Sequence, residues 1–430
     1  MSKLYWIISL TIILSSCGSS IKNGYTDKIS YSPEDPISIY INAKKNIKDY
    51  QLNITDINGN VLKSFAQDIF PQNIHPEKPY ENGFQYQLTG KISTPNFESG
   101  IYLFNEKIPF VIKPVKPCDI LILYSSNTEN AYCESGGKST YGYNSSNKVP
   151  ASIVSFRRPI GLPFHSTEFL RWIAKNKEYK IGYIADQDLD EYKNISSAKL
   201  LIIPGHSEYW TRKARNNFDR FISEGKNALI LSGNTMWWQV RYNEKENQMI
   251  CYKNDTDPIK DTTLKTINWT DSTLQYSVIN SIGLDFNLGG YGKKEDKGWD
   301  GYKIVTPSSP LLKGTGLKLN SIISLPTDEY DGGQLIFSSD SASVTLNNSS
   351  NFYRYELIGY DIGSRKKKSN GAWIVMQKNE NSGIIINTGS TDWCQKAGME
   401  GKSSKVIKKI TLNMIDLLLK DNKNNIFTTK

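Results

Sequence analysis

A histidine and a glutamate, separated by one residue, lie in a loop that follows an apolar run of the chain. Leu200–Ile203 is short and apolar and is ended by Pro204 and a glycine, which is typical of a buried strand. His206 and Glu208 come next, and a helix is expected from Thr211, which can cap it. In an open α/β sheet, ligands bind in such a loop between a strand and a helix. An imidazole placed there can shuttle protons near neutral pH, and a carboxylate beside it can hold a metal ion or a water molecule.

The His-x-Glu spacing alone is a weak signal, and each residue has a structural alternative. Glu208 could form an ion pair with Arg158, and His206 could be a core histidine whose hydrogen bonds are satisfied within the protein. Tyr209 and Trp210 could simply cover the sheet.

Polar side chains follow other predicted strands in the same way. Tyr132, Arg158 and Asn234 each come after a different apolar run, far apart in the sequence. Since the carboxyl ends of parallel strands meet at one edge of a sheet, we expect these residues to converge on Glu208. The alternatives are that Tyr132 packs in the core and that Asn234 only satisfies the backbone of its loop.

Apolar runs alternate with helical stretches between residues 114 and 430. The runs predicted as strands are Ile120–Leu123, Ser152–Phe156, Lys180–Ile184, Leu200–Ile203, Ala228–Leu231 and Gly383–Asn387. Helices are expected over Ser166–Lys177 and Ser404–Lys420. This alternation predicts an α/β fold with a three-layer, mostly parallel sheet. Residues 240–382 are rich in turns and short strands, and we expect them to form a β-rich insertion or lid.

Residues 24–113 are predicted to be entirely β. Ile37–Ile41 and Tyr50–Ile54 alternate apolar and polar side chains, as half-buried strands do. Asn58 and Gly59 between later strands predict a hairpin turn. This region is therefore expected to be an immunoglobulin-like β-sandwich that precedes the α/β domain and spaces or covers it.

The N-terminal residues predict export and a lipid anchor. Lys3 is followed by the apolar stretch Leu4–Leu14, and two serines then precede Cys17. This pattern is a signal peptide and resembles the lipobox of bacterial lipoproteins, so we expect a lipid on Cys17 and a short tether up to residue 23. The alternative is ordinary cleavage that removes Cys17. No other stretch could cross a membrane, so the lipid would be the only contact with it. We expect an outer-membrane lipoprotein of a Gram-negative-type bacterium, facing the periplasm, because no acidic residues follow Cys17 directly.

Charge and cysteine content limit the classes of partner. The net charge of +9 comes mainly from scattered lysines, so we expect no nucleic-acid partner and instead a small-molecule substrate or ligand. The sequence does not decide whether the protein forms a homo-oligomer. The other cysteines are Cys118, Cys133, Cys251 and Cys394, and none has Cys-x-x-Cys spacing, so a zinc ribbon is not expected. One or two disulfides could form, and the sequence does not choose their pairing.

Taken together, these motifs resemble the family of the large (beta) subunit of N,N-dimethylformamidase. The matching pieces are Ala131-Tyr132, Gly136–Ser139, Ser155-Phe156-x-Arg158-Pro159, Gly205-His206-x-Glu208-Tyr209-Trp210, Gly233-Asn234 and Cys251–Lys253. The resemblance covers roughly residues 114–420. It implies a class I glutamine-amidotransferase-like α/β domain and hydrolysis of a carbon–nitrogen amide bond in a small polar substrate.

The resemblance also implies a mononuclear iron, Fe(III), held by two tyrosinates and one glutamate. Tyr132 and Glu208 match two of these ligands, His206 matches a proton shuttle, and Asn234 matches a residue of the pocket. The remaining residues expected to bind substrate are Arg158, Tyr209, Trp210, Trp237 and Trp393.

The sequence departs from the family at two positions. Ile160 stands where the family has a tyrosine after Arg-Pro, and Gly298 stands near Trp299 and Asp300 where the family has a carboxylate. The residues that could substitute in space are Glu295, Asp296, Tyr141 and Tyr143. If the site has decayed, the alternative is a lipoprotein that binds a sugar or peptide. The exposed aromatic side chains would then stack on the ligand; those expected to do so are Tyr209, Trp210, Trp237 and Trp238.

Overall fold

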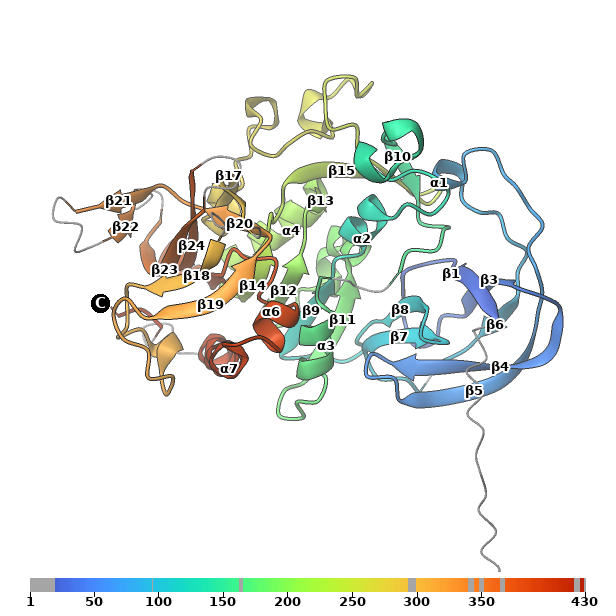
Figure 1. Cartoon of the computed structure of the whole chain (residues 1–430), viewed down its shortest axis with the longest axis horizontal. Coiled ribbons are helices and arrows are strands. Elements are labelled where there is room, and N and C mark those ends of the chain that lie inside the picture. The colour runs from blue at the N-terminus through green and yellow to red at the C-terminus, as the bar shows by residue number, and fades with distance from the viewer. Residues whose placement is uncertain are drawn as a thin grey trace, which may run out of the picture.

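The structure is a computed structural model, and it combines a small β-sandwich with a larger domain built on one long sheet (Figure 1). It describes residues 20–94, 96–161, 165–292, 299–338, 344–347, 352–363, 368–420 and 426–428. Cys17, Glu295, Asp296 and Gly298 lie outside these residues, so the lipidation site and two of the substitute ligands stay predictions. Within the described residues, no helix is both long and apolar enough to cross a membrane.

The β-sandwich consists of two sheets packed around an apolar core. One sheet has the order β1 (Ile21–Thr26), β3 (Ile37–Ala43) and β6 (Gly90–Ile92). The other has the order β2 (Ser30–Tyr31), β8 (Ile108–Ile112), β7 (Gly100–Phe104), β4 (Ile47–Asp56) and β5 (Val61–Ile69). Alternate residues of β3 are buried, as the sequence pattern predicts. Since β1 begins at Ile21, which is buried, the sandwich starts before the predicted boundary at residue 24.

The larger domain is built on an 11-stranded mixed sheet. Its parallel half consists of β11 (Ile181–Ala185), β9 (Ile120–Tyr124), β12 (Leu200–His206), β14 (Asn227–Gly233) and β25 (Ile384–Asn387). Its antiparallel half consists of β24 (Ser369–Gln377), β23 (Arg354–Gly363), β18 (Trp299–Ile304) and β19 (Ile322–Thr327), with β17 (Asp285–Tyr291) and β20 (Glu329–Gly332) beside it.

The predicted three-layer, mostly parallel α/β sheet is therefore wrong. Strands account for 37% and helices for 20% of the residues that the structure describes, and much of the pairing is antiparallel. Most strands from Asp285 onward, within the region predicted as a β-rich insertion or lid over 240–382, extend the main sheet past β25 with antiparallel pairing. The physical reason is that antiparallel strands need only short turns between them, so no helices separate them in the sequence. The likeness to the glutamine-amidotransferase fold stays a prediction.

A second group of strands lies beside the main sheet. It has the order β10 (Ile153–Ser155), β16 (Gln248–Ile250), β15 (Trp238–Asn243) and β13 (Tyr209–Thr211). The run Ser152–Phe156 thus forms a strand as predicted, but not in the main sheet. A separate hairpin pairs β21 (Leu335–Phe337) with β22 (Val344–Leu346).

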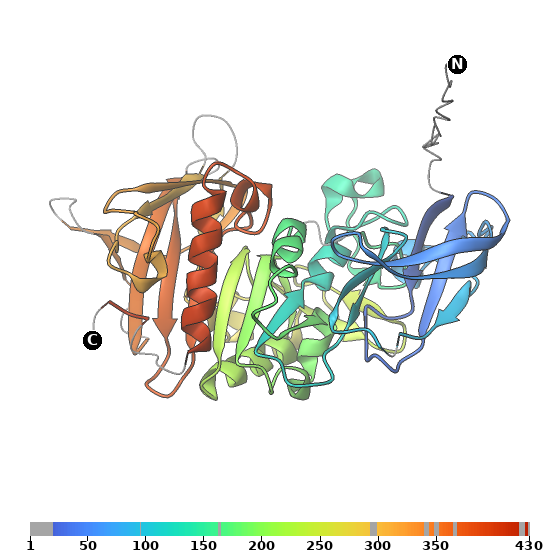
Figure 2. The ribbon, with the colours of Figure 1, turned by 90° about the horizontal axis from the view of Figure 1, so that it is seen from below.

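The described residues form seven α-helices. They are α1 (Pro79–Asn82), α2 (Ser126–Tyr132), α3 (Thr167–Ile173), α4 (Arg212–Ser223), α5 (Ile279–Ile282), α6 (Lys396–Met399) and α7 (Ser404–Leu419). Alternate residues of β12 pack in two different cores, one with the apolar face of α7 and the other with that of α4. Figure 2 shows α7 lying along the strands. The predicted cap of α4 is confirmed, since the Thr211 hydroxyl accepts a hydrogen bond of 3.0 Å from the backbone N–H of Ala214.

Candidate functional site

A cluster of titratable side chains lies at the carboxyl ends of β12 and β14. His206 is the last residue of β12, and the preceding Gly205 has a φ of +75°. A Cβ atom on Gly205 would lie 2.4 Å from the carbonyl oxygen of His165, so a larger residue does not fit there. This tight turn brings the loop that carries His165 against the end of β12.

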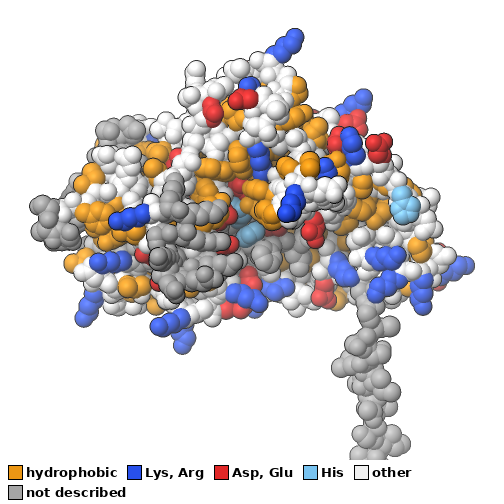
Figure 3. Space-filling model, turned by 45° about the horizontal axis from the view of Figure 1, so that its top comes forward, with side chains coloured by type: hydrophobic (Ala, Val, Ile, Leu, Met, Phe, Trp, Pro, Cys, Tyr) orange, Lys and Arg blue, Asp and Glu red, His pale blue; other side chains and the backbone are white. Residues whose placement is uncertain are grey.

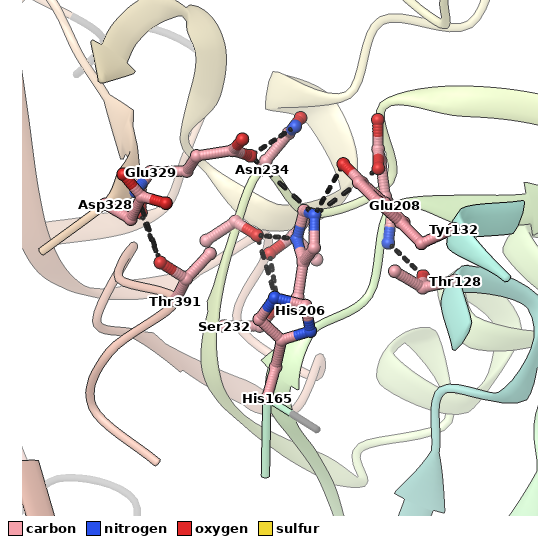
Figure 4. A network of polar contacts seen from close by, with 12 residues as sticks. Thr128, Tyr132, His165, His206, Glu208, Ser232, Asn234, Asp328, Glu329 and Thr391 are labelled. Carbon is pink, nitrogen blue, oxygen red and sulfur yellow. Dashed lines mark hydrogen bonds and ion pairs between the residues drawn. The ribbon is translucent and has the colours of Figure 1, made fainter. Parts of the chain in front are cut away.

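His206 lies at the centre of this cluster (Figure 4). Its Nδ1 is 3.0 Å from the carbonyl oxygen of Gly233, which can only accept, so Nδ1 carries a hydrogen. Its Nε2 lies 3.3 Å from the hydroxyl of Tyr132, 3.3 Å from Oε2 of Glu208 and 3.7 Å from Oε2 of Glu329. Nε2 is therefore the nitrogen that can exchange a proton.

The two carboxylates determine the charge of this imidazole. Burial by itself lowers the pKa of His206, but the contact with Glu208 and the charges of Glu329 and Glu208 outweigh it and raise the pKa to about 9. Burial raises the pKa of Glu208, but the contacts with His206 outweigh it, so the net shift is downward. Burial and the nearby charge of Glu208 raise the pKa of Glu329. Without another cation, the imidazole is therefore protonated at neutral pH.

Two phenols extend the cluster on the other side of Glu208. The Tyr141 hydroxyl donates to Oε1 of Glu208 at 2.6 Å, and the Tyr132 hydroxyl donates to that of Tyr141 at 3.2 Å. Burial and the charge of Glu208 raise the pKa of both phenols well above the ordinary value. Oε2 of Glu208 is buried and accepts no hydrogen bond, although it lies within ion-pair distance of His206.

Neighbouring elements fix the carboxylate and one phenol in place. The backbone N–H of Glu208 donates to the hydroxyl of Thr128 in α2 at 2.9 Å. Nζ of Lys253 lies 3.3 Å from the ring centroid of Tyr141 and donates to the hydroxyl of Tyr209 at 2.7 Å. A buried ammonium over this ring favours negative charge on the phenol. Burial lowers the pKa of Lys253.

The cluster opens into a cavity of about 1000 Å³ between the β-sandwich and the larger domain. Tyr132, His206 and Glu329 line it on the side of the larger domain, together with His165, whose Nδ1 lies 3.8 Å from Oε1 of Glu129. Figure 3 shows a histidine side chain and acidic side chains together near the middle of this face. A cavity with convergent titratable groups is the usual form of an active site.

The structure brings four of the predicted site residues together. Tyr132 and Glu208 both contact His206. Asn234 joins them because its Nδ2 donates at 2.8 Å to Oε2 of Glu329, which itself lies 3.7 Å from Nε2 of His206. Asn234 has a φ of +50°, which places its side chain beside the end of β14. The expected convergence of separate loops at one edge of the sheet therefore occurs for these residues.

Three other predicted residues lie away from the cavity. Arg158 is fully buried and donates to backbone carbonyls instead of forming an ion pair with Glu208. Trp210 is buried, and its ring N–H donates to the carbonyl of Ser207. Trp393 is also buried, and its ring N–H donates to the hydroxyl of Thr411 in α7. Their contacts place these three side chains in the core of the protein.

The remaining aromatic residues of the predicted site contact residues of the cluster or its neighbours. Tyr209 is fully buried and holds Lys253, so it is not the exposed stacking surface that the sequence suggested. The backbone N–H groups of Trp237 and Trp238 donate to the carbonyl of Glu208 at 2.8 and 2.9 Å. The Trp237 ring packs edge-on against Phe286, with ring centroids 5.0 Å apart.

The sequence alone gave no indication of Glu329. It is the first residue of β20 and lies in the turn-rich region that was read as a lid. Its backbone N–H donates to the hydroxyl of Thr391, which holds it against the loop after β25. An acidic pair, Asp328 and Glu329, before a short strand was the available signal, and acidic pairs in turns are too common to be specific.

Comparison with known proteins agrees with this arrangement. The model of the N,N-dimethylformamidase beta subunit-like family, C-terminal part, matches residues 71–404, which is more than half of the chain. The chain belongs to this family. The predicted resemblance is thereby confirmed, and an amide-hydrolase-like function follows from membership. No curated protein matches the sequence.

Two solved structures resemble the chain weakly. The N-terminal domain of mmIFT52 shares 9% identity and a TM-score of 0.34, over 58% of this chain and 90% of that one. A ThuA-like protein from Bacteroides uniformis ATCC 8492 shares 10% identity and a TM-score of 0.32, over 71% of this chain and 93% of that one. Similarity at this level supports no statement about function.

The dimethylformamidase resemblance implies two tyrosinates and a glutamate around one metal ion, and the residues present fit that set. Ile160 lines the cavity and cannot coordinate, but Tyr141 places a second phenol beside Glu208. Oxygen ligands about 2.0–2.2 Å from a metal lie about 3 Å from one another. Two oxygen pairs are near this spacing: the hydroxyls of Tyr132 and Tyr141 lie 3.2 Å apart, and the hydroxyl of Tyr141 lies 2.6 Å from Oε1 of Glu208. Oε2 of Glu208 accepts no hydrogen bond.

Histidine, cysteine and carboxylate ligands do not form a separate metal site. In the described part of the chain, no group of three or more such side chains could hold an ion without the tyrosines. Cys118, Cys133, Cys251 and Cys394 are all free, so none of the disulfides that the sequence left possible among them is present. Burial raises the pKa of Cys251 to about 12, so this thiol stays protonated and is a poor ligand.

Proposed function

We propose that the protein is a metal-assisted hydrolase of an amide carbon–nitrogen bond. The observation that carries the proposal is the convergence of two half-buried phenols and one buried carboxylate next to an imidazole at the cavity wall. The hydroxyl of Tyr141 lies 2.6 Å from Glu208, and the hydroxyl of Tyr132 lies 3.3 Å from His206. Family membership supports the same type of reaction.

Tyr132, Tyr141 and Glu208 would hold the metal ion. When bound, a hard ion such as Fe(III) polarises a carbonyl group and lowers the pKa of a bound water molecule. Both phenols must lose a proton to act as ligands, and their burial opposes this. A metal ion of high charge is therefore favoured over one of low charge. The ammonium of Lys253, which lies over the Tyr141 ring, also favours loss of the Tyr141 proton.

His206 is the base that moves protons in this proposal. Nδ1 donates to Gly233, so Nε2 is the site of proton exchange. The negative charge that keeps the imidazole protonated would be cancelled by a cation held by Glu208, and the neutral Nε2 would then take the proton of the attacking water and later return it to the leaving amine. Oε2 of Glu329, which lies 3.7 Å from Nε2, stabilises the imidazolium, and Asn234 orients this carboxylate. Asn234 is thus a positioning residue, while His206 is the proton carrier.

Metal content and amide hydrolysis, measured on the same preparations, test this proposal. We expect the purified protein to contain close to one equivalent of iron and to release amine from a panel of small amides. Glu208→Gln should lose both the metal and the activity. Tyr143→Phe is the matched control, because Tyr143 lines the cavity but its side chain is exposed and makes no hydrogen bond in the cluster.

A metal-free protein that still hydrolyses amides would contradict the metal assignment. A protein that only binds sugars or peptides would contradict the hydrolase.

The proposal includes a lipid anchor on Cys17. It is supported by the apolar stretch and the small residues before this cysteine. Cell fractionation tests it, with the wild type expected in the membrane fraction and Cys17→Ala expected in a different fraction or unprocessed. Membrane attachment that is unchanged by this substitution would contradict it.

A further inference from the structure

The β-sandwich forms one wall of the cavity at which the proposed reaction takes place. Lys22, Asn23 and Gly24 of β1 line it, as does Lys107, which precedes β8. Nζ of Lys107 donates to the carbonyl of Ile21 at 2.9 Å, which ties this turn to β1. The sandwich is therefore part of the site and not only a spacer.

The size of this cavity points to a substrate larger than a simple formamide. Pockets of roughly 300–1,000 Å³ enclose ligands of drug size, and this cavity reaches the upper end at about 1000 Å³. The reacting groups occupy only the side formed by Tyr132, His206 and Glu329. The rest of the space, up to β1, is available for a part of the substrate that is remote from the scissile bond.

Charges of opposite sign line opposite sides of the cavity. The carboxylates all belong to the larger domain; they are Glu129, Glu134, Asp328 and Glu329. The lysines both belong to the sandwich, and neither forms an ion pair with another described residue. An amine that leaves during amide hydrolysis becomes an ammonium ion, which the carboxylate side favours. The lysine side favours an anionic group at the other end of the molecule.

We infer that the substrate is an extended amide that carries a carboxylate or phosphate remote from its scissile bond, with Lys22 and Lys107 selecting this group. The inference rests on the proposed function and adds the substrate class. Lys22, Asn23 and Gly24 lie outside the range that the family model matches, whereas Lys107 lies within it. Binding energy from such a remote group can be used to orient the reacting amide.

Both lysines are exposed, so solvent and salt screen their effect. Ion pairs of exposed lysines are worth about 0.2–1 kcal/mol each, which for two lysines corresponds to about a two- to thirty-fold preference. The preference should shrink as the ionic strength rises from low salt to about 0.5 M, because the screening length falls below the size of the cavity.

Titration calorimetry with three matched probes tests the inference. The probes are peptide-length amides that end in a carboxylate, in a phosphate monoester or in a neutral methyl ester. The wild-type holoprotein should bind an anionic probe about five- to ten-fold more tightly than the ester at low salt. Comparing the two anionic probes decides between carboxylate and phosphate. The double variant Lys22→Gln/Lys107→Gln should lose the preference.

The matched control is Lys48→Gln/Lys91→Gln, which removes two exposed sandwich lysines that do not line the cavity. This control should keep the preference. The inference would be overturned if the Lys22/Lys107 variant kept the wild-type preference, or if the wild type itself showed no preference. Because calorimetry needs no turnover, anion-selective binding without hydrolysis would overturn the hydrolase and leave the selectivity. Hydrolysis of amides without a preference for the anionic probes would overturn the inferred selectivity and leave the proposed hydrolase.

Discussion

Two buried charged groups of the larger domain, Arg158 and Glu208, differ in how their hydrogen bonds are satisfied. The guanidinium of Arg158 donates to the side chain of Asn130 at 2.9 Å and to the carbonyls of Ser135 and Lys138 at 3.1 and 2.9 Å. A further bond reaches the carbonyl of Asn130. In the cluster beside the cavity, Oε2 of Glu208 instead accepts no hydrogen bond and has only an ion-pair contact of 3.3 Å with Nε2 of His206.

This difference separates a structural group from a reactive one. A buried charge whose bonds are complete holds chain segments together, and here Arg158 fastens the end of α2 to the loop that follows it. A buried charge with unsatisfied atoms costs stability, and proteins tolerate such a cost mainly at functional sites. The sequence placed both groups in one site, and only the geometry distinguishes them.

Arg158→Met should give the largest loss of stability. It leaves several buried carbonyl groups without donors, and breaking a buried charged network costs about 3–5 kcal/mol. Urea unfolding measures the free energy of unfolding, and the adjacent, exposed Arg157→Met is the control, expected within about 0.5 kcal/mol of wild type. If both variants lose the same small amount, Arg158 has no structural role of this kind.

Asp257→Asn should lower the free energy of unfolding by an intermediate amount that depends on pH. Arg241 binds this buried carboxylate with two hydrogen bonds of 2.7 and 2.9 Å, and Thr266 donates to it twice. Burial alone raises the pKa of Asp257, but these bonds outweigh it and hold the pKa well below the ordinary value. We expect a loss of about 2–3 kcal/mol at pH 7.

The sign of the pH dependence follows from the lowered pKa. The carboxylate's contribution to stability is present above the unfolded pKa of about 4 and is lost as the pH falls through the folded value. The difference between Asp257→Asn and wild type should therefore narrow below about pH 4, as measured by urea unfolding at pH 7 and pH 3. Asp255→Asn, whose side chain is 91% exposed, should show almost no change at either pH. A difference that widens in acid would refute this assignment.

Tyr132→Phe should have the smallest effect on stability and a large effect on activity. Its hydroxyl makes contacts of 3.2 and 3.3 Å, which are long, so the free energy of unfolding should fall by about 1 kcal/mol or less. Amine release should nevertheless fall to background, while Tyr143→Phe should keep it. A loss of several kcal/mol would make Tyr132 a structural residue like Arg158.

The sequence predicted the parts of the fold that depend on local patterns. The strands β9, β11, β12, β14 and β25 and the helix α4 with its cap at Thr211 all lie where periodicity and capping residues indicated. It could not predict the antiparallel half of the sheet. A short strand such as β18 or β19 has no helix after it, and its partners are chosen by contacts far along the chain.

The same limit applies to the candidate site. His206, Glu208, Tyr132 and Asn234 directly follow or end recognisable elements, so motif spacing was enough to find them. Glu329 reaches the cluster only through tertiary contacts, which no local pattern records. Tyr141 is one of the four candidates that the sequence offers for the missing ligand, and its contact with Glu208 is what distinguishes it. Trp210 and Trp393 were expected at the site because of their sequence neighbours, but hydrogen bonds of their ring N–H groups place them in the core.

The central claim is that Tyr132, Tyr141 and Glu208 share one metal ion. The most direct measurement is a crystal structure of the purified protein with diffraction data collected on both sides of the iron absorption edge. The account predicts an anomalous peak within about 2.0–2.2 Å of an oxygen from each of the three side chains. A map without a peak there, in protein that hydrolyses amides, would contradict it.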